Sequence, residues 1–405
     1  MRDSSYQGAN KATICHMTSA HRHDDIRIFR KQCVFLAKAG FRVVLIAPHV
    51  SGKELDSVHI VAVPLPRSRT ERLFWTTARI FFAALKQRAA LYHFHDPELI
   101  GVGLLLRLLG KTVVYDVHED YGKTFNADER EYINSSLLGI ARVAVNLLER
   151  LADKKMSGIV TVTRSIAQNF TNRNTVVVQN YPIVDEFFDG HSTEEHPKTR
   201  NGGIYIGGLS VKRGAKEIVA ALGLMEQDPR ARILFAGTFV PPTLQTLLKE
   251  QRGSEKLEYR GLKSRAEMAD LLRTTQFGVV TFHPAPNHLE AQPNKLFEYM
   301  SAGLPVIASN FPLWREIVEG DACGLVVDPL SPEEIASAMR WLLDHADEAE
   351  AMGKRGRKAV REKYSWDAEF SKLLGLYRRL LGEHETEGVS SHAPDSRQPT
   401  ISALQ

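Results

Sequence analysis

The sequence predicts an α/β protein made of two doubly wound domains that face each other across a cleft. Short apolar runs rich in Val, Ile and Leu alternate with longer segments of helical period, which is typical of strand–helix units in a parallel sheet. The alternation stops once, at a polar stretch over residues 186–201 that has no apolar period, and then starts again. At 405 residues the chain also exceeds what one hydrophobic core usually serves.

The individual elements follow from this alternation. In the first domain, strands are expected at residues 12–17, 42–47, 58–63, 91–94, 112–117, 158–162 and 175–178, and helices at 26–39, 67–90, 97–109 and 137–155. In the second domain, strands are expected at residues 203–206, 232–236, 257–260, 277–282, 305–308 and 324–327, with final helices at 331–345, 347–362 and 366–381. The predicted organisation is a domain at 1–185, a linker at 186–201, a domain at 202–365, a C-terminal helix at 366–382 and a disordered tail at 383–405.

The composition excludes several classes of protein. With 43% hydrophobic and 25% charged residues, the chain is not disordered throughout. The three cysteines lie far apart, which disfavours a disulfide framework or a zinc site and favours a reducing cytosol. The longest apolar run, residues 99–109, is interrupted by Arg107 and is shorter than the roughly 20 residues of a membrane span. We therefore expect a cytoplasmic protein.

Polar residues follow many of the predicted strands, at the edge where ligands bind in open α/β sheets. Asp24 and Asp25 follow the first strand, His95 follows the fourth, and His118 follows the fifth. Taken singly, such a residue is more often a helix cap or a satisfied surface group. Several such turns opening on the same side favour a binding site.

Residues 207–214 predict a strand-to-helix turn that binds a diphosphate. Gly207 and Gly208 let a ligand approach the backbone, the helix start offers free amides, and Lys212 and Arg213 add positive charge. The alternative is a glycine-rich turn followed by a solvated basic pair. The motif is not a Walker loop, because no Gly-x-x-x-x-Gly-Lys-Ser/Thr occurs.

Two glutamates follow in the second domain. Glu290 and Glu298 are eight residues apart, and Pro293 predicts a helix start between them. Two carboxylates so placed can hold two parts of one polyhydroxylated ligand, since a carboxylate accepts hydrogen bonds from vicinal hydroxyls. The alternative is that Glu298 is an exposed helix residue.

The chain resembles the retaining GT-B glycosyltransferases of glycosyltransferase family 4 over residues 12–381. The resemblance rests on the Glu-x7-Glu motif of Glu290 and Glu298, the run at 294–308, the turn at 207–214 and His118. It implies two Rossmann-like domains, with the C-terminal helices returning to the first. It also implies a nucleotide-sugar donor in the second domain, a glycan or lipid-linked acceptor in the first, and a hexose transferred with retention in cell-surface polysaccharide or oligosaccharide biosynthesis.

The resemblance also assigns roles to residues. Glu298 matches the glutamate that binds the ribose diol, Glu290 the one beside the donor sugar and leaving group, and Arg213 the base that neutralises the diphosphate. His118 matches the histidine near the reacting sugar, where we expect it to donate to a sugar hydroxyl. The acceptor side is expected to include Asp24, Asp25 and His95.

Two departures from the family pattern concern the diphosphate. Gly208 stands where many relatives have an arginine, and Ala291-Gln292-Pro293 replaces the usual Gly-Phe-Gly. We expect Lys295 to compensate, in a clamp with Arg213 and Lys212 to which Asn294 adds a donor. No Asp-x-Asp occurs, so we expect neither a metal nor a cofactor.

Other functions remain open at this point. A nucleotide-sugar epimerase on the same fold would need no acceptor, and a non-catalytic GT-B partner subunit would transfer nothing. Nucleic-acid binding is disfavoured, because basic residues are dispersed and no recognition motif occurs. Residues 67–90 form a basic amphipathic segment that either binds anionic membrane at the inner face of the plasma membrane or packs on the sheet as an ordinary helix.

Overall fold

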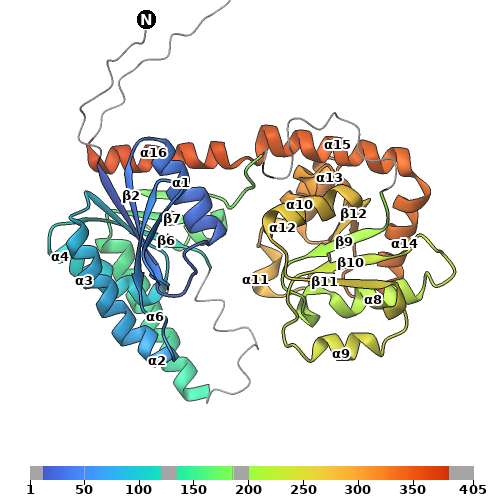
Figure 1. Cartoon of the computed structure of the whole chain (residues 1–405), viewed down its shortest axis with the longest axis horizontal. Coiled ribbons are helices and arrows are strands. Elements are labelled where there is room, and N and C mark those ends of the chain that lie inside the picture. Colours follow the sequence, from blue (N-terminus) through green and yellow to red (C-terminus); the bar gives the residue numbers. More distant parts are fainter. Residues whose placement is uncertain (1–11, 50, 120–134, 185, 187–199, 383–405) are drawn as a thin grey trace, which may run out of the picture.

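The computed structural model describes residues 12–49, 51–119, 135–184, 186 and 200–382, and it contains two α/β domains, each with its own sheet (Figure 1). The predicted architecture of two doubly wound units is confirmed. Most of the predicted linker and the whole of the predicted tail lie outside the described residues. Within the described residues, no helix combines the length and the hydropathy that a membrane span requires.

The N-terminal sheet has the strand order β3-β4-β2-β1-β5-β6-β7-β8, and its strands are parallel except for β3 against β4. The strands are β1 (Thr13–Met17), β2 (Arg42–Pro48), β3 (Lys53–Leu55), β4 (Val58–Val63), β5 (Leu91–Phe94), β6 (Thr112–Val117), β7 (Gly158–Thr161) and β8 (Thr175–Val177). The sequence did not predict β3, because its three residues include two charged side chains and bury none of them.

Helices cover both faces of this sheet. They are η1 (Ile26–Cys33), α1 (Val34–Lys38), α2 (Arg69–Glu71), η2 (Arg72–Thr76), α3 (Thr77–Gln87), η3 (Pro97–Leu99), α4 (Ile100–Leu108), α6 (Ser135–Lys155) and α7 (Arg164–Ala167). Buried side chains of α3 and α4 join one apolar cluster on the sheet, and those of η1 and α1 join a second. The sheet is therefore buried on both faces, as an apolar run without strict alternation predicts.

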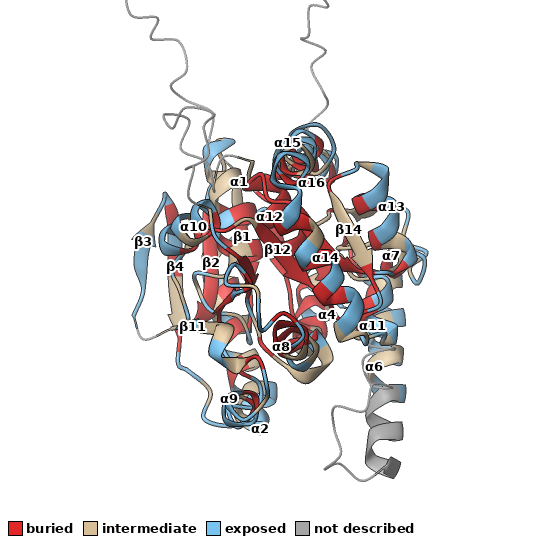
Figure 2. Ribbon diagram, turned by 90° about the vertical axis from the view of Figure 1, so that its right-hand side faces the viewer, coloured by how far each residue is buried: buried red, intermediate tan, exposed pale blue. Residues whose placement is uncertain are grey.

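The C-terminal sheet has the order β11-β10-β9-β12-β13-β14, and all its pairs are parallel. The strands are β9 (Gly203–Ile206), β10 (Ile233–Ala236), β11 (Leu257–Gly261), β12 (Phe277–Val280), β13 (Val306–Ser309) and β14 (Gly324–Val327). Its helices are η4 (Val211–Arg213), α8 (Ala215–Gly223), α9 (Leu244–Lys249), η5 (Ser254–Lys256), α10 (Arg265–Thr274), α11 (Pro286–Leu289), α12 (Asn294–Ser301), α13 (Pro312–Gly320), α14 (Pro332–Asp344) and α15 (Ala346–Lys363). One continuous apolar cluster fills this domain, and the central strands are buried (Figure 2).

The last helix, α16 (Trp366–Leu381), leaves the second domain and packs on the first (Figure 1). Trp366, Leu373, Leu376 and Tyr377 are fully buried in the cluster formed with η1, α1 and the N-terminal sheet. The Trp366 indole also donates to the Lys31 carbonyl at 3.1 Å. The expected return of the C-terminal helices to the first domain is thereby confirmed.

The strand register brings the polar turns together. Met17 lies opposite Phe94, and Phe94 lies opposite Tyr115, so β1, β5 and β6 end side by side. The residues that follow, with His95 and His118 among them, therefore share the carboxyl edge of the sheet, where open α/β sheets bind ligands.

Candidate active site

A cavity of about 730 Å³ lies between the two domains and is lined by residues of both. It brings together most of the site residues expected from the sequence: Asp25, His118, Gly207, Gly208, Arg213, Glu290, Asn294, Lys295 and Glu298. Three others do not line it. Lys212 belongs to η4 but is not part of the cavity wall, Asp24 forms an exposed ion pair with Arg22, and His95 is fully buried next to His118.

The turn after β9 has the strand–turn–helix form that a phosphate site needs. Gly214 adopts a left-handed conformation with φ of 81°, and a Cβ there would lie 2.1 Å from the Thr281 carbonyl oxygen. Only glycine fits, so the turn brings Arg213 to the cavity wall. There the Arg213 guanidinium donates to the Gly208 carbonyl at 3.4 Å and lies over the Phe282 ring.

Lys295 is a buried lysine at the start of α12. Its side chain is 7% exposed, and its Nζ lies 3.6 Å from the centre of the Tyr205 ring. Among the described residues the Nζ has no hydrogen-bond partner. Burial lowers its pKa well below the usual lysine value, and the nearby Arg213 charge adds to this effect. A bound anion would give the Lys295 Nζ a hydrogen-bond acceptor and would favour its charged form.

Glu298, on the next turn of α12, belongs to a chain of ion pairs. Arg265 donates to Glu298 at 2.7 Å and makes two hydrogen bonds with Glu186, at 2.6 and 3.0 Å. Arg30 of η1 lies 3.6 Å from Glu186. The carboxylate of Glu298 is therefore held in place by Arg265, and the chain reaches from one domain to the other.

Glu290 lies at the end of α11 and is exposed in the cavity wall. The segment behind it is fixed, because the Trp314 indole donates to the Ala291 carbonyl at 2.7 Å. The Gln292 side chain bonds with Gln179 of the first domain. The segment that replaces Gly-Phe-Gly thus contacts the opposite domain across the cavity.

On the N-terminal side, Asp96 organises the turn after β1. One of its oxygens, Oδ2, accepts from the Thr18 hydroxyl at 2.7 Å and from the Ser19 amide at 2.6 Å. Asp25 caps η1 by accepting from the Ile28 amide at 2.9 Å. Burial would raise the pKa of Asp25, but hydrogen bonds from His21 and the Ile28 amide outweigh it and lower the pKa to about 2. Asp25 is therefore ionised at the cavity wall, where its Oδ2 lies 3.6 Å from the Nδ1 of His21.

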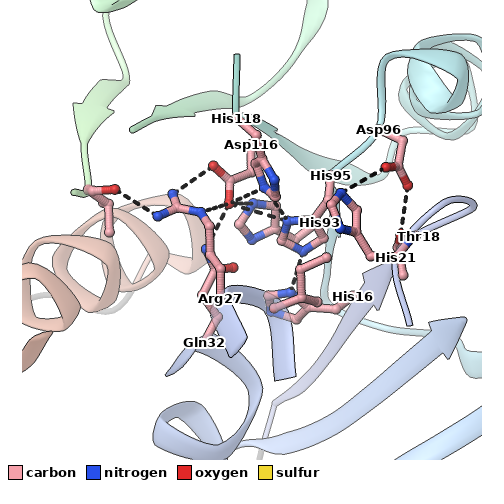
Figure 3. A network of polar contacts seen from close by, with 12 residues as sticks. His16, Thr18, His21, Arg27, Gln32, His93, His95, Asp96, Asp116 and His118 are labelled. Carbon is pink, nitrogen blue, oxygen red and sulfur yellow. Dashed lines mark hydrogen bonds and ion pairs between the residues drawn. The ribbon is translucent and has the colours of Figure 1, made fainter. Parts of the chain in front are cut away.

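A network of histidines lies beneath His118 and centres on Asp116 (Figure 3). The described residues contain two triplets spaced closely enough to hold a metal ion: His16, His93 and His95, and His95, Asp116 and His118. Arg27 already neutralises Asp116 through two hydrogen bonds, so a divalent ion would leave uncompensated charge among buried groups. In the first triplet the ring nitrogens are already hydrogen-bonded, His16 with His95 and Tyr377, and His93 with Tyr377. The arrangement fits hydrogen bonding better than metal binding.

Sequence analysis missed Arg265, Asp96 and Asp116. Asp116 did carry a signal, since a charged residue inside the apolar run of β6 lies two positions before His118 and so on the same face of the strand. Asp96 precedes Pro97 in a turn and gave no more than a capping signal. Arg265 is the first residue of an ordinary capped helix, and the sequence contains no signal of a functional role for it.

Two protein families match the sequence. The family described as "Glycosyl transferases group 1" matches residues 189–359, and "Glycosyltransferase Family 4" matches residues 28–180. The capsular polysaccharide biosynthesis glycosyltransferase CapM of Staphylococcus aureus is 21% identical, over 92% of this chain and 98% of its own length. An MMP alpha-(1->4)-mannosyltransferase of Mycolicibacterium hassiacum is 22% identical, over 71% of this chain and 70% of its own. A glycosyltransferase of Methanocaldococcus jannaschii is 23% identical, over 58% of this chain and 63% of its own.

Solved structures share the fold. Sucrose-phosphate synthase from Thermosynechococcus elongatus superimposes with a TM-score of 0.75 at 17% identity, over 92% of this chain and 100% of that one. Anabaena HepE in complex with UDP and glucose gives a TM-score of 0.68 at 12% identity, over 91% and 100%. The two family matches together cover most of the sequence and both domains. The chain therefore belongs to the group 1 glycosyltransferases of family 4, which have the GT-B fold.

Proposed function

We propose that this glycosyltransferase moves a hexose from a nucleoside-diphosphate sugar to a glycan or lipid-linked acceptor, with retention at the anomeric carbon. The observation that carries the proposal is the buried Lys295 side chain beside Arg213 in a cavity shared by both domains, where its Nζ has no hydrogen-bond partner among the described residues. Two fixed cations at a glycine-rich turn suit a diphosphate leaving group. A role in cell-surface polysaccharide synthesis is supported by the name of the S. aureus relative.

In the proposed reaction, the bond between the anomeric carbon and the diphosphate oxygen breaks while the acceptor oxygen bonds to the same carbon. Arg213, Lys295 and the free amides at the start of α12 stabilise the negative charge that gathers on the diphosphate. The departing diphosphate takes the proton of the acceptor hydroxyl. Glu298, held by Arg265, accepts from the ribose hydroxyls, and Glu290 orients the sugar.

We propose further that no metal ion takes part at the diphosphate. Arg213 and Lys295 supply fixed positive charge there, and the sequence contains no Asp-x-Asp. Turnover should then be unchanged when EDTA replaces divalent ions in the assay. A loss of turnover that Mg²⁺ or Mn²⁺ restores would contradict this.

The test of the reaction is nucleotide release from a panel of UDP- and GDP-sugars, with and without acceptor extract. A transferase releases nucleotide only with acceptor, an epimerase changes the sugar without release, and a non-catalytic subunit does neither. Lys295→Met should abolish release, while Lys216→Met, on the exposed face of α8, should not. Proton NMR of the product reports the anomer. In the proposed reaction the acceptor attacks from the face that the diphosphate leaves, so a glycosyl adduct trapped on Glu290 would contradict it.

We also propose that residues 67–90 bind anionic membrane, which suits a lipid-linked acceptor. The helices α2, η2 and α3 bury Ile80 and Ala84 against the sheet but expose Phe74, Trp75 and Phe82 by 66, 67 and 62%. Arg69, Arg72, Arg79 and Lys86 lie in the same segment. Aromatic side chains beside basic ones favour the interface of an anionic bilayer.

Sedimentation with vesicles tests the membrane proposal. The protein should pellet with phosphatidylglycerol vesicles at low salt and stay in the supernatant with phosphatidylcholine alone. The double substitution Phe74→Ser, Trp75→Ser should abolish pelleting without changing nucleotide release to a water-soluble acceptor. Unchanged pelleting of this variant would contradict the proposal.

A further inference from the structure

The Asp116 carboxylate is a buried acceptor with many donors. The Arg27 guanidinium donates to its Oδ1 at 2.8 Å and to its Oδ2 at 3.1 Å, and the Gln32 amide donates to Oδ2 at 2.7 Å (Figure 3). Burial by itself would raise the pKa of Asp116, but the Arg27 charge and the neighbouring histidines hold it well below the usual value. Asp116 is therefore ionised, and an ionised carboxylate only accepts hydrogen bonds.

Two histidines face the same oxygen. The Nε2 of His118 and the Nδ1 of His95 each lie 3.2 Å from Oδ2 of Asp116. An unprotonated ring nitrogen at that distance would set its lone pair against the carboxylate, so both nitrogens carry protons. The 3.3 Å approach of these two nitrogens is then the meeting of two donors at one acceptor, and no hydrogen bond joins the rings.

The proton on Nδ1 of His95 determines which ring nitrogens of His16 and His93 carry protons. With its proton on Nδ1, the neutral His95 accepts at Nε2 from the Nδ1 of His16, 3.0 Å away. His16 then accepts at its Nε2 from the Tyr377 hydroxyl at 3.3 Å, and Tyr377 accepts from the Nδ1 of His93. Burial lowers the pKa of His16 and His93 well below the ordinary value and that of His95 to about 3, so these rings are neutral.

The reverse order of donors and acceptors in this hydrogen-bond network is disfavoured by the distance between His95 and Asp116. It would place the proton of His95 on Nε2 and leave Nδ1 unprotonated against the carboxylate at 3.2 Å. In exchange, His93 would direct an Nε2 proton toward the same carboxylate across 4.0 Å, beyond hydrogen-bond range. The reversal therefore gives up a charge-assisted bond and gains none.

We propose that Asp116 is a positioning residue that fixes His118 in the tautomer protonated at Nε2, so that His118 presents an unprotonated Nδ1 as a hydrogen-bond acceptor. The group it receives is a hydroxyl of the sugar bound in the cavity, whose wall includes His118. This rests on the proposed function. It reverses the expectation from the sequence, in which His118 donates to that hydroxyl.

The tautomer is tested directly by long-range proton–nitrogen NMR on the full chain labelled with ¹⁵N-histidine, with His118 assigned by its loss in His118→Gln. We expect the Nε2 of His118 at the position of a protonated nitrogen and Nδ1 at that of an unprotonated one. The Nδ1 signal should move further with the nucleotide sugar selected by the release assay than with its nucleoside diphosphate alone. A proton on Nδ1 of His118 would overturn the proposal.

Kinetics supply the second readout. Asp116→Asn removes the fixed charge and offers an amide donor, so His118 is free to change tautomer. We expect kcat to fall roughly 10- to 100-fold while the KM for the donor changes less than about twofold. The matched control is Asp153→Asn, whose carboxylate accepts from Thr171 and Asn172 outside the cavity, and it should leave kcat unchanged.

The two proposals fail in different ways. The NMR experiment needs no turnover, so an inactive wild-type protein with the expected tautomer would reject the proposed function and leave the role of Asp116 in place. An active protein with His118 protonated at Nδ1 would reject the role of Asp116 alone. If Asp116→Asn fails to fold, because Arg27 is left buried and unpaired, the wild-type NMR result still decides.

Discussion

At the residue scale, the site depends on cations that are costly to keep in the empty protein. Lys295 is buried against the Tyr205 ring, and Arg213 contributes to lowering its pKa. Such an arrangement stores unfavourable electrostatic energy that an anionic ligand relieves. In the proposed clamp Lys295 takes the place of the arginine that Gly208 replaces, and its Nζ lies 3.6 Å from the position that a Gly207 Cβ would take.

Arg213→Ala should lower turnover by roughly 100-fold or more, because it removes one donor to the leaving diphosphate. The Arg213 side chain is exposed and makes one long hydrogen bond, so the fold should survive. Nucleotide release and circular dichroism measured on the same sample check both statements. Near-normal turnover would exclude Arg213 from the clamp.

Residue identity was predictable where the chemistry is local in the sequence. The phosphate turn, Lys295 and the two glutamates lie within short motifs, and the structure brings them to one cavity. Glu298 pairs with Arg265, and these residues belong to two different helices, α12 and α10. No sequence pattern predicts this pairing. The proton order around Asp116 depends on distances between four separate strand and helix positions, which no pattern along one strand contains.

At the element scale, hydrogen bonds to two aspartates fix the turn between β1 and η1. Asp96 accepts from Thr18 and Ser19, and Asp25 caps η1. Side-chain hydrogen bonds therefore fix the conformation of this turn. The predicted strands at the sheet centres match the structure closely, because parallel strands buried on both faces give continuous apolar runs. The short edge strand β3 lacks that signal.

The cap gives a pH-dependent stability that can be measured. Because the folded pKa of Asp25 is about 2 and the ordinary value is 3.8, its contribution is complete above pH 4 and is lost as the pH falls toward 2. Asp25→Ala should cost about 1–2 kcal/mol of unfolding free energy at pH 7, and this difference should shrink between pH 4 and pH 2. Urea unfolding at several pH values checks it, with the exposed Asp24→Ala as control. A difference that does not depend on pH would exclude the ion pair with His21 as its source.

At the scale of the whole molecule, α16 makes the first domain dependent on the last residues of the described chain. Trp366 and Tyr377 are fully buried in the core of the first domain, and the Tyr377 hydroxyl also joins His93 to His16 in the hydrogen-bond network around Asp116. The two domains are therefore not independent folding units in sequence order. The hydrophobic stripe of this helix was visible in the sequence, but its partner became visible only through the family resemblance.

Trp366→Ala should destabilise the protein by about 3–5 kcal/mol, the usual cost of truncating a buried aromatic side chain. The loss should appear as an earlier unfolding transition of the first domain, monitored by urea denaturation with near-ultraviolet circular dichroism. Trp341→Ala, at a half-buried position on α14 of the second domain, is the matched control and should leave that transition in place. Equal midpoints for the two variants would mean that α16 contributes little to the first domain.

The ion pairs from Arg30 through Glu186 and Arg265 to Glu298 have a further consequence. Arg265 divides its positive charge between two carboxylates, so a ligand that draws on Glu298 alters the strength with which Arg265 holds Glu186. Glu186 in turn forms an ion pair with Arg30, on η1 of the first domain. Binding of the proposed nucleotide at Glu298 should therefore change the ion pairs that link the second domain to Arg30 of the first.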